Sequence, residues 1–586
     1  MNKLSKKKDG QSFLEGTVIL VFATMVVKVI GAIFKIPLSD ILGEVGYGYF
    51  TVAYGLFTPL YSLAMAGLPV AVARMVSQRA TQKRYRDVKK ILRVSTALFT
   101  FTGALGSLIM VLSSGVYART IARTPAAFLS IICLAPAVFF CCMMSSRRGY
   151  YEGLKNMYPT AISQMLEAVV KLVFGLLLSW LVIYVGTNQF ESTKTVFGTP
   201  CADLTEAMSV IYPFSSAAAI LGVTLSTAAG ALYLHIKYKV SGDNITPEEL
   251  LSSPPAQNGK SVLRSLLKIA IPVSLGTLAT TLTTFIDSSS VINRLDFIMD
   301  KNSDVIVAMY NGISDKVSEL SEVSTFIYGA YGYAINVFNL IPTLTTAFAI
   351  SALPSVTSAW TLKNKELTKK SVETVLRITS LLAFPAGIGI SLMSKPILKF
   401  LYPSEVRALG VEIATPALSL LGIAVIFVAL LTPINSMLQA VGRADLPVKL
   451  MLIGGSIKIV TNFILVSIPK INVKGAPIGT ILCYVFLFLS SMYFLCKRIG
   501  MVPDIKMTFL KPLIAGTVCG VVAYLSYMLV ENLVSQRIAT VISIIFAAVV
   551  YAICLLLLRA ITKDDIILLP KGKNIVKMLE KKGLIG

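Results

Sequence analysis

Charge is the first thing that this sequence lacks. Only 14% of its 586 residues are charged, whereas 55% are hydrophobic. A soluble chain of this length carries about 25% charged residues. Because the apolar residues also come in long runs, the composition excludes an ordinary soluble protein and predicts an integral membrane protein.

Groups with catalytic or metal-binding chemistry are scarce as well. The chain has one histidine, His235, and eight cysteines whose spacing suits neither a disulfide framework nor a zinc site. It has no G-x-x-x-x-G-K-[ST] loop, which argues against ATP hydrolysis. The sequence therefore predicts that this protein is not an enzyme and uses no cofactor and no metal.

The net charge of +24 does not indicate a nucleic-acid partner. The basic residues lie in short segments between hydrophobic blocks and not in one basic domain. We therefore expect no nucleic acid among the partners of this chain.

Fourteen apolar runs are long enough to cross a bilayer, which takes roughly 20 residues. They lie at about 13–37, 46–71, 91–114, 123–146, 158–184, 208–234, 264–290, 325–350, 372–394, 411–436, 447–468, 475–496, 508–530 and 538–560. Each run has to be helical, because a lipid-facing backbone cannot leave its hydrogen bonds unmade. The predicted fold class is an all-α membrane protein with about fourteen transmembrane helices.

The distribution of lysine and arginine predicts the topology. With the N-terminus inside, the inner segments carry 38 Lys and Arg residues, the outer loops carry 12, and four lie within spans. This bias places both termini in the cytoplasm. Segments 77–90 and 363–370 are then cytoplasmic, and segments 190–208 and 291–324 are external.

The sequence also repeats itself. Gly153 and Pro159 match Gly442 and Pro447, 289 and 288 residues later, and Pro69 matches Pro354, 285 residues later. The predicted parts are a six-helix lobe at 13–238, a second six-helix lobe at 262–498, two further helices at 505–562 and a basic tail at 563–586. Two similar lobes leave a cleft between them, which suits alternating access.

Ionisable residues within spans are functional candidates, because a charge in a bilayer is costly. The six that lie well inside spans are Lys28, Lys35, Glu167, Lys171, Asp287 and Lys458. Lys28 and Lys35 are seven residues apart, so both lie on one helix face, roughly 10 Å apart along the axis. Four lysines against two carboxylates favour a polyvalent anion such as pyrophosphate, whereas an exporter of cations would present the opposite field.

Structural explanations remain open for several of these charges. Lys35 and Lys458 can snorkel to the interface. Glu167 and Lys171, an i,i+4 pair, can neutralise each other, and Asp287 can pair with Arg294. The candidate substrate-binding residues of a basic cavity are Lys28, Lys35, Arg74, Lys171 and Lys458, although the positive-inside rule alone explains Arg74. The coupling or gating candidates are Asp40, Glu167, Asp287 and Arg294.

Three stretches carry a family resemblance: "FLEGTVILVFATMVVKVIGAIFKIPLSDILGEVGYGYF", "AGLPVAVARMVSQ" and "RRGYYEGLKNMYPTAISQMLEAVVKLV". They resemble the polysaccharide-biosynthesis branch of the multidrug/oligosaccharidyl-lipid/polysaccharide (MOP) flippases, within it the stage V sporulation protein B group and the MurJ-type lipid II flippases. "FIDSSSVINR" also fits this branch.

The resemblance implies a V-shaped, two-lobed transporter of the bacterial plasma membrane. It implies export of an undecaprenyl-pyrophosphate-linked saccharide, with the headgroup in a basic cavity and the lipid tail along a groove at the last two helices. Lys28 occupies a place that is usually arginine in MurJ-type proteins, which keeps the charge but loses the bidentate fork for phosphate.

Three functions are therefore weighed. The preferred function is a flippase for a lipid-linked oligosaccharide, foremost the peptidoglycan precursor lipid II. The alternatives are a multidrug or cation antiporter of the same superfold, and a non-transporting scaffold in envelope or spore assembly, for which the intramembrane lysines would be dispensable. The expected partners are the lipid-linked substrate, membrane lipids and envelope-synthesis proteins, and the chain is expected to act as a monomer.

Overall fold

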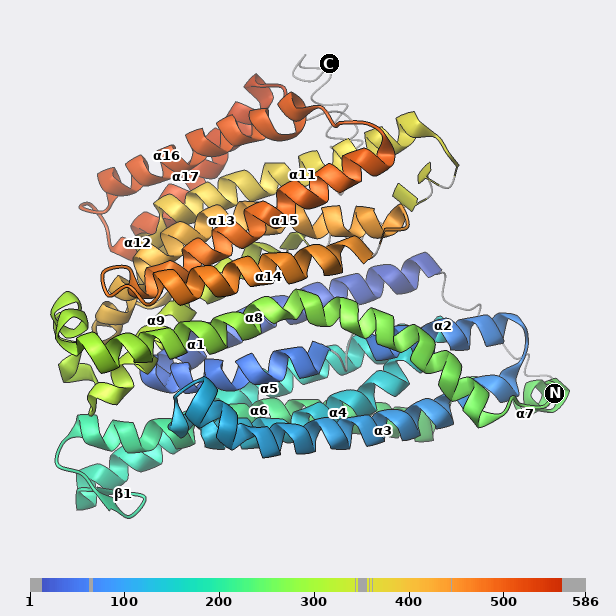
Figure 1. Cartoon of the computed structure of the whole chain (residues 1–586), viewed down its shortest axis with the longest axis horizontal. Coiled ribbons are helices and arrows are strands. Elements are labelled where there is room, and N and C mark those ends of the chain that lie inside the picture. Colours follow the sequence, from blue (N-terminus) through green and yellow to red (C-terminus); the bar gives the residue numbers. More distant parts are fainter. Residues whose placement is uncertain are drawn as a thin grey trace, which may run out of the picture. The chain divides into compact units, whose positions relative to one another are not determined.

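The chain is almost entirely helical in the part that the structure describes (Figure 1). The computed structural model describes residues 13–62, 67–342, 344–345, 356–357, 359–360, 362–443 and 445–560, with the backbone alone at 13–21, 32, 272–273 and 275–284. Pro354 of the predicted repeat and the predicted tail 563–586 lie outside these residues.

Contacts divide the chain into two units. The first unit holds the chain up to Leu42 together with Tyr49–Ser289, and the second unit holds Gly43–Gly48 and the chain from Ser290 onward. This division differs from the predicted lobe boundaries, because the first part of the helix Gly259–Met309 packs with the first unit. The two six-helix lobes inferred from the repeat stay a prediction.

The first unit is built from the helices before residue 290 and one short hairpin. Its elements are α1 Phe13–Ser62, α2 Leu68–Thr81, α3 Tyr85–Val116, α4 Phe128–Gly153, α5 Tyr158–Thr193, β1 Thr195–Val196, β2 Thr199–Pro200, α6 Leu204–Ser241, α7 Pro247–Ser252 and the beginning of α8 Gly259–Met309. Short turns join these helices, so that sequence neighbours such as α3 and α4, or α5 and α6, pack against each other.

The second unit contains the remaining helices. They are α9 Val323–Phe338, α11 Lys365–Leu392, α12 Ser394–Leu401, α13 Ala408–Ala440, α14 Asp445–Leu465, α15 Gly475–Ile499, α16 Lys511–Val530 and α17 Gln536–Leu557. The last helix is joined to α11 by a hydrogen bond of 2.6 Å from the hydroxyl of Tyr551 to the carbonyl oxygen of Leu381. The two helices predicted beyond the repeat are α16 and α17.

Ten helices of the described part are long and apolar enough to cross a membrane. The other four predicted spans, 13–37, 46–71, 264–290 and 325–350, begin in α1, α8 and α9. The prediction of an all-α membrane protein with about fourteen spans is therefore confirmed. The eight cysteines are all free, as their scattered spacing predicts.

Helix α1 holds the first predicted span and most of the second, because it bends back at Gly43. The backbone there has φ 67° and ψ 178°, a conformation that essentially only glycine adopts. The rings of Phe34, before the bend, and Phe50, after it, lie 6.4 Å apart. A straight helix would hold residues with this spacing about 24 Å apart, so the two limbs of α1 run back along each other.

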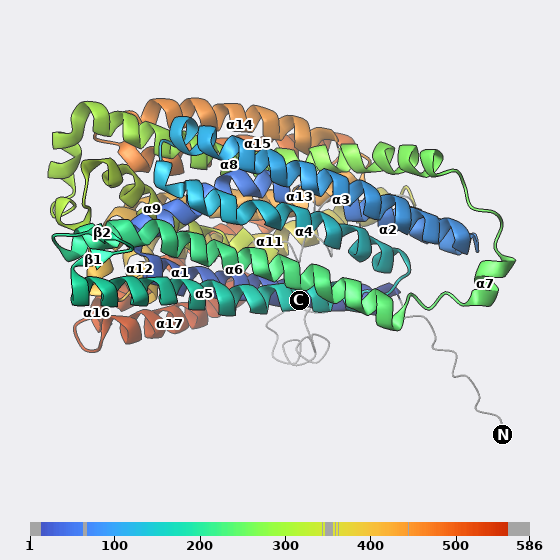
Figure 2. The ribbon, with the colours of Figure 1, turned by 90° about the horizontal axis from the view of Figure 1, so that it is seen from below.

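The loops of the first unit gather at its two ends. Hairpin β1–β2 lies at one end and α7 at the other (Figure 2). The hairpin turns at Phe197 and Gly198, both with positive φ, and Asp203 then caps α6 by accepting a hydrogen bond from the backbone N–H of Glu206. The hairpin belongs to segment 190–208, which the charge bias assigns to the outside. Helix α7 lies between the predicted spans 208–234 and 264–290, in a loop that the charge bias assigns to the cytoplasm.

The segment 291–324, which is predicted to be external, is helical in its first part, and its sidedness stays a prediction. Helix α8 continues to Met309, with one non-helical residue at Asn302. Apolar residues spaced three apart in this stretch bury Ile292, Leu295 and Ile298 on one helix face. The acidic residues on the other face suggested a loop, although they belong to a solvated helix surface.

Candidate functional site

Two of the predicted lysines, Lys35 and Lys171, come together where the first limb of α1 packs along α5, and Lys28 lies two turns before Lys35 on the same face of α1. The hydroxyl of Thr24 donates a hydrogen bond of 3.3 Å to the side-chain oxygen of Gln164, and Phe34 packs against Gly175 ten residues further along α1. The sequence offset between these contacts is almost constant, so the two helices run parallel over this length.

Lys28 and Lys35 lie on the face of α1 that is turned toward α5. Residues Thr24, Lys28, Gly31 and Lys35 form one stripe, because their spacing of four, three and four keeps them within about 60° on a helix. The ammonium of Lys171 reaches this stripe at Gly31, where a side-chain carbon would lie 3.9 Å from Nζ. Lys171 therefore approaches α1 between Lys28 and Lys35.

The ammonium of Lys171 has an aromatic neighbour and a repulsive one. Its Nζ lies 5.4 Å from the centre of the Phe34 ring, within the range of a cation–π interaction. Lys35 and Lys171 are close enough to repel each other electrostatically. We call Lys28, Lys35 and Lys171 the basic cluster.

Glu167 does not form the predicted ion pair with Lys171. Its carboxylate accepts a hydrogen bond of 3.0 Å from Nη2 of Arg148 on α4, whose Nε donates to the hydroxyl of Ser163 at 2.9 Å. The side chain of Arg148 is 3% exposed. Glu167 still attracts Lys171 at longer range. The main countercharge of Glu167 is thus an arginine, and the basic cluster keeps a positive excess.

The other first-unit candidates are Arg74, Asp40 and Asp287. Arg74 is exposed on α2, as expected for a residue that only sets topology, and Asp40 is exposed on α1 before the bend at Gly43. Asp287 is half-buried on α8, next to Ser288, whose hydroxyl lies 3.3 Å from that of Tyr117.

The last two candidates belong to the second unit. Lys458 of α14 is 2% exposed, so it does not snorkel to the surface. One turn further along, the amide nitrogen of Asn462 donates to the hydroxyl of Ser290 at 3.0 Å. The guanidinium of Arg294 lies 4.0 Å from the centre of the Phe463 ring and donates to the side-chain oxygen of Asn293.

The sequence did not indicate two buried ion pairs that the structure reveals. One is Arg148 with Glu167. The other lies in the second unit, where Nη1 of Arg407 donates to Glu44 at 2.9 Å and Glu44 is 3% exposed. These partners are 19 and 363 residues apart, so helical spacing gives no sign of them. The available signal was a charge near a span end; for Arg148, at an inner end, the positive-inside rule explains the charge equally well.

No group of three or more metal-ligating side chains occurs among the described residues. What the basic cluster can do chemically is bind an anion by charge, with ammonium groups that donate hydrogen bonds to oxygen.

Two family models match separate parts of the chain. The model described as "Polysaccharide biosynthesis protein" matches residues 13–192, which include the basic cluster. The model described as "MatE" matches residues 317–464.

Two curated relatives from Bacillus subtilis (strain 168) match most of the chain. Stage V sporulation protein B is 22% identical over 96% of this chain and 98% of its own length. Lipid II flippase MurJ is 23% identical, covering 84% of each protein.

Two solved structures share the fold. An inward-facing multidrug resistance MATE family transporter of the MOP superfamily aligns with a TM-score of 0.60 and 15% identity, covering 82% of this chain and 98% of its own. Lipid II flippase MurJ in an inward closed conformation aligns with a TM-score of 0.59 and 14% identity, covering 92% and 98%.

Proposed function

Because this chain belongs to the flippase-like MOP superfamily of membrane transporters, we propose that it moves an undecaprenyl-pyrophosphate-linked saccharide between the leaflets of a bacterial plasma membrane. The direction is from the inner to the outer leaflet, by alternating access. The preferred substrate is the peptidoglycan precursor lipid II.

The basic cluster is the observation that carries this proposal. The ammonium groups of Lys35 and Lys171 lie close together at the α1–α5 contact, Lys28 follows on the same face of α1, and the nearby carboxylate of Glu167 is engaged by Arg148. Like charges this close raise each other's energy, and an anion between them relieves the repulsion. A pyrophosphate carries enough negative charge to interact with several ammonium groups at once.

The lysines would bind the pyrophosphate as point charges. A lysine ammonium has three donors on a flexible stem, so it can follow a phosphate as the headgroup moves. Arg148 offers the fork geometry that suits phosphate, but Ser163 and Glu167 hold its guanidinium. In this proposal Arg148 positions Glu167, and Lys28, Lys35 and Lys171 contact the substrate.

A cation antiporter is the second candidate, and the "MatE" match to residues 317–464 is the observation that favours it. Such a protein needs a carboxylate that is available to a cation. Glu167, the acidic residue beside the basic cluster, is bound by an arginine. The relative named lipid II flippase MurJ also supports the flippase over the antiporter.

We expect Lys28→Ala to abolish flipping while the protein still folds and inserts. The measurement is complementation of a strain that lacks its lipid II flippase, together with the amount of protein in the membrane. Lys28→Arg keeps the charge and should retain most of the activity. Lys237→Ala, which removes a lysine that hydrogen-bonds to Ser241 at the end of α6, is the matched control and should complement normally.

Normal complementation by Lys28→Ala would contradict the role of the basic cluster, and would favour the scaffold function if Lys35→Ala and Lys171→Ala were also normal. The substrate is tested by depleting the protein and measuring which undecaprenyl-linked intermediate accumulates on the inner leaflet. Accumulation of lipid II supports the preferred substrate. Retention of organic cations without any such accumulation would favour the antiporter.

A further inference from the structure

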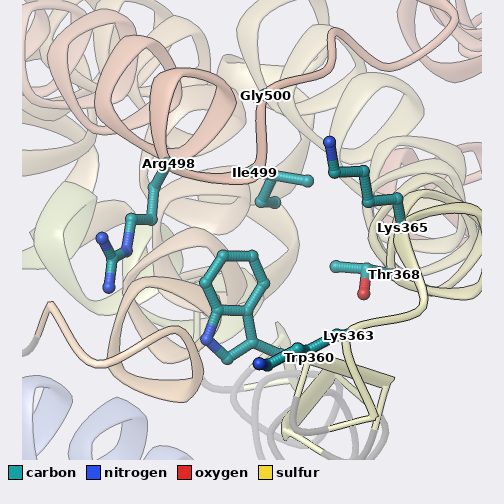
Figure 3. A pocket seen from close by; sticks show the side chains of 7 residues that line it. All are labelled: Trp360, Lys363, Lys365, Thr368, Arg498, Ile499 and Gly500. Atoms are coloured by element: carbon teal, nitrogen blue, oxygen red, sulfur yellow. The ribbon is translucent and has the colours of Figure 1, made fainter.

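A second basic site lies in the second unit, away from every candidate residue discussed so far. It is a pocket of 620 Å³ at the beginning of α11 and the end of α15 (Figure 3). Its lining residues are Trp360, Lys363, Lys365, Thr368, Arg498, Ile499 and Gly500. Arg498 and Lys365 lie on opposite sides of the space, with Trp360 and Ile499 between them (Figure 3). We call this space the α11–α15 pocket.

The lining of the α11–α15 pocket is strongly positive. It contains two lysines and one arginine and no carboxylate. Glu373, five residues beyond Thr368 on α11, is occupied by Lys369 and by the backbone N–H of Asp504. Neither Lys363 nor Lys365 has an ion-pair partner among the described residues. The pocket therefore presents three positive charges to whatever enters it.

The arginine of this pocket is held in place on one side only. The guanidinium of Arg498 lies 5.5 Å from the centre of the Trp360 ring, and its Nε donates to the carbonyl oxygen of Val441 at 3.4 Å. In the described part of the chain no protein acceptor contacts its terminal nitrogens. Those nitrogens can donate to phosphate oxygens, which is the geometry that arginine forms best.

The start of α11 adds to the positive field. Asn364 caps this helix of 28 residues by accepting a hydrogen bond of 2.9 Å from the backbone N–H of Leu367. Lys365 and Thr368 of the first turn line the pocket, whereas the exposed Glu366 of the same turn is not among the lining residues. The positive end of a helix dipole favours an anion, and here it adds to three formal charges.

The pocket lies at the level where spans end. Helix α11 begins at Lys365 and α15 ends at Ile499, and both are long and apolar enough to cross the membrane. The positive-inside bias assigns this end to the cytoplasm, where anionic lipids attract basic residues. Tryptophan is typical of the membrane interface, and Trp360 with Ile499 gives the pocket an apolar wall beside its charges.

We propose that the α11–α15 pocket binds the phosphate headgroup of an anionic phospholipid of the inner leaflet. The phosphate lies between Lys363, Lys365 and Arg498, and the glycerol and upper acyl chain lie against Trp360 and Ile499. This lipid is a resident ligand of the second unit and not the transported substrate. The proposal does not depend on the identity of that substrate.

Trp360 provides a direct probe of this site. The chain has two tryptophans, so in a Trp180→Phe background the emission reports on Trp360 alone. The purified full-length protein in detergent is titrated with dihexanoyl phosphatidylglycerol, dihexanoyl phosphatidylcholine and inorganic phosphate. We expect a saturable change with phosphatidylglycerol, a much weaker one with phosphatidylcholine, and at most a weak one with inorganic phosphate.

Removing the charges should remove the binding. Replacing Lys363, Lys365 and Arg498 by alanine should weaken the binding of phosphatidylglycerol about 100-fold, and Arg498→Gln alone about fivefold. The matched control replaces Lys83, Lys155 and Lys260 by alanine. These lysines are exposed on the same predicted side of the membrane, and two of them have the positive φ that Lys363 also has. The control should bind like the parent.

Each of three results would overturn the proposal. They are equal affinity for the two lipids, unchanged affinity in both the triple variant and Arg498→Gln, and saturation by inorganic phosphate at the same concentration as by phosphatidylglycerol. The last result would identify a free phosphate ion as the ligand. Circular dichroism and gel filtration check that the variants are folded, and Arg498→Gln serves as the test if the triple variant is not.

Discussion

Glu167 has two basic residues in its vicinity, and the structure gives its ion pair to the one that is more distant in sequence. The carboxylate lies 3.0 Å from Arg148 on α4, although Lys171 is one turn away on its own helix. Arg148 is held further by Ser163, so the guanidinium is fixed from two sides. Lys171 is then available to α1. Because Arg148 and not Lys171 neutralises Glu167, the basic cluster keeps its positive charge.

We expect Arg148→Met to destabilise the protein by about 3 kcal/mol, because it leaves the partly buried carboxylate of Glu167 without its main countercharge. The measurement is thermal unfolding in detergent. The double variant Arg148→Met, Glu167→Gln removes both charges and should recover most of the stability. Equal losses in the single and double variants would show that Arg148 contributes through packing and not through this ion pair.

At the scale of the element, α1 depends on one glycine. The bend at Gly43 turns the first limb back so that Phe34 meets Phe50, and it allows the Lys28 face to follow α5. The residue after the bend, Glu44, is buried and paired with Arg407. A continuous apolar pattern over α1 gives no sign of this turn, whereas the two separate runs at 13–37 and 46–71 predict that a break lies between them.

Gly43→Ala should therefore cost about 1–3 kcal/mol of stability, because its φ and ψ are costly for any residue with a side chain. Gly389→Ala is the control. Gly389 lies within α11, and a side-chain carbon there would meet no atom within 4 Å. Alanine favours a helix over glycine, so the control should be neutral or more stable by up to about 1 kcal/mol. Thermal unfolding of both variants in the same detergent compares them, and an equal effect would argue against strain at the bend.

At the scale of the whole molecule, the charge bias makes a prediction about sidedness. In a background without the eight natural cysteines, Thr199→Cys in the exposed hairpin should react with a membrane-impermeant maleimide in intact cells. Lys83→Cys, in the exposed turn between α2 and α3, should react only after the membrane is opened. The opposite pattern would invert the topology, and would place the α11–α15 pocket on the external side.

Much of the fold could be predicted from the sequence, whereas the site could be predicted only in part. Helical spacing predicts that Lys28 and Lys35 lie on the same face of α1. Lys171, which was a candidate because it is an ionisable residue within a span, approaches that face. The partner of Glu167 could not be predicted, because Arg148 lies on another helix. The burial of Lys458 and the stacking of Arg294 on Phe463 likewise depend on which helix face meets which neighbour.

The sequence by itself determined that this chain lies in a membrane, that its spans are helices, and which charges are costly enough to need a reason. Those properties depend on the length, hydropathy and spacing of residues within each segment, because the thickness of the bilayer and its lack of water act on each segment separately. Only the tertiary structure decided which cation neutralises Glu167, where α1 turns back, and that Trp360 and Arg498 line one basic pocket. Each of these depends on contacts between segments that are distant in sequence, which a pattern along a single helix does not record.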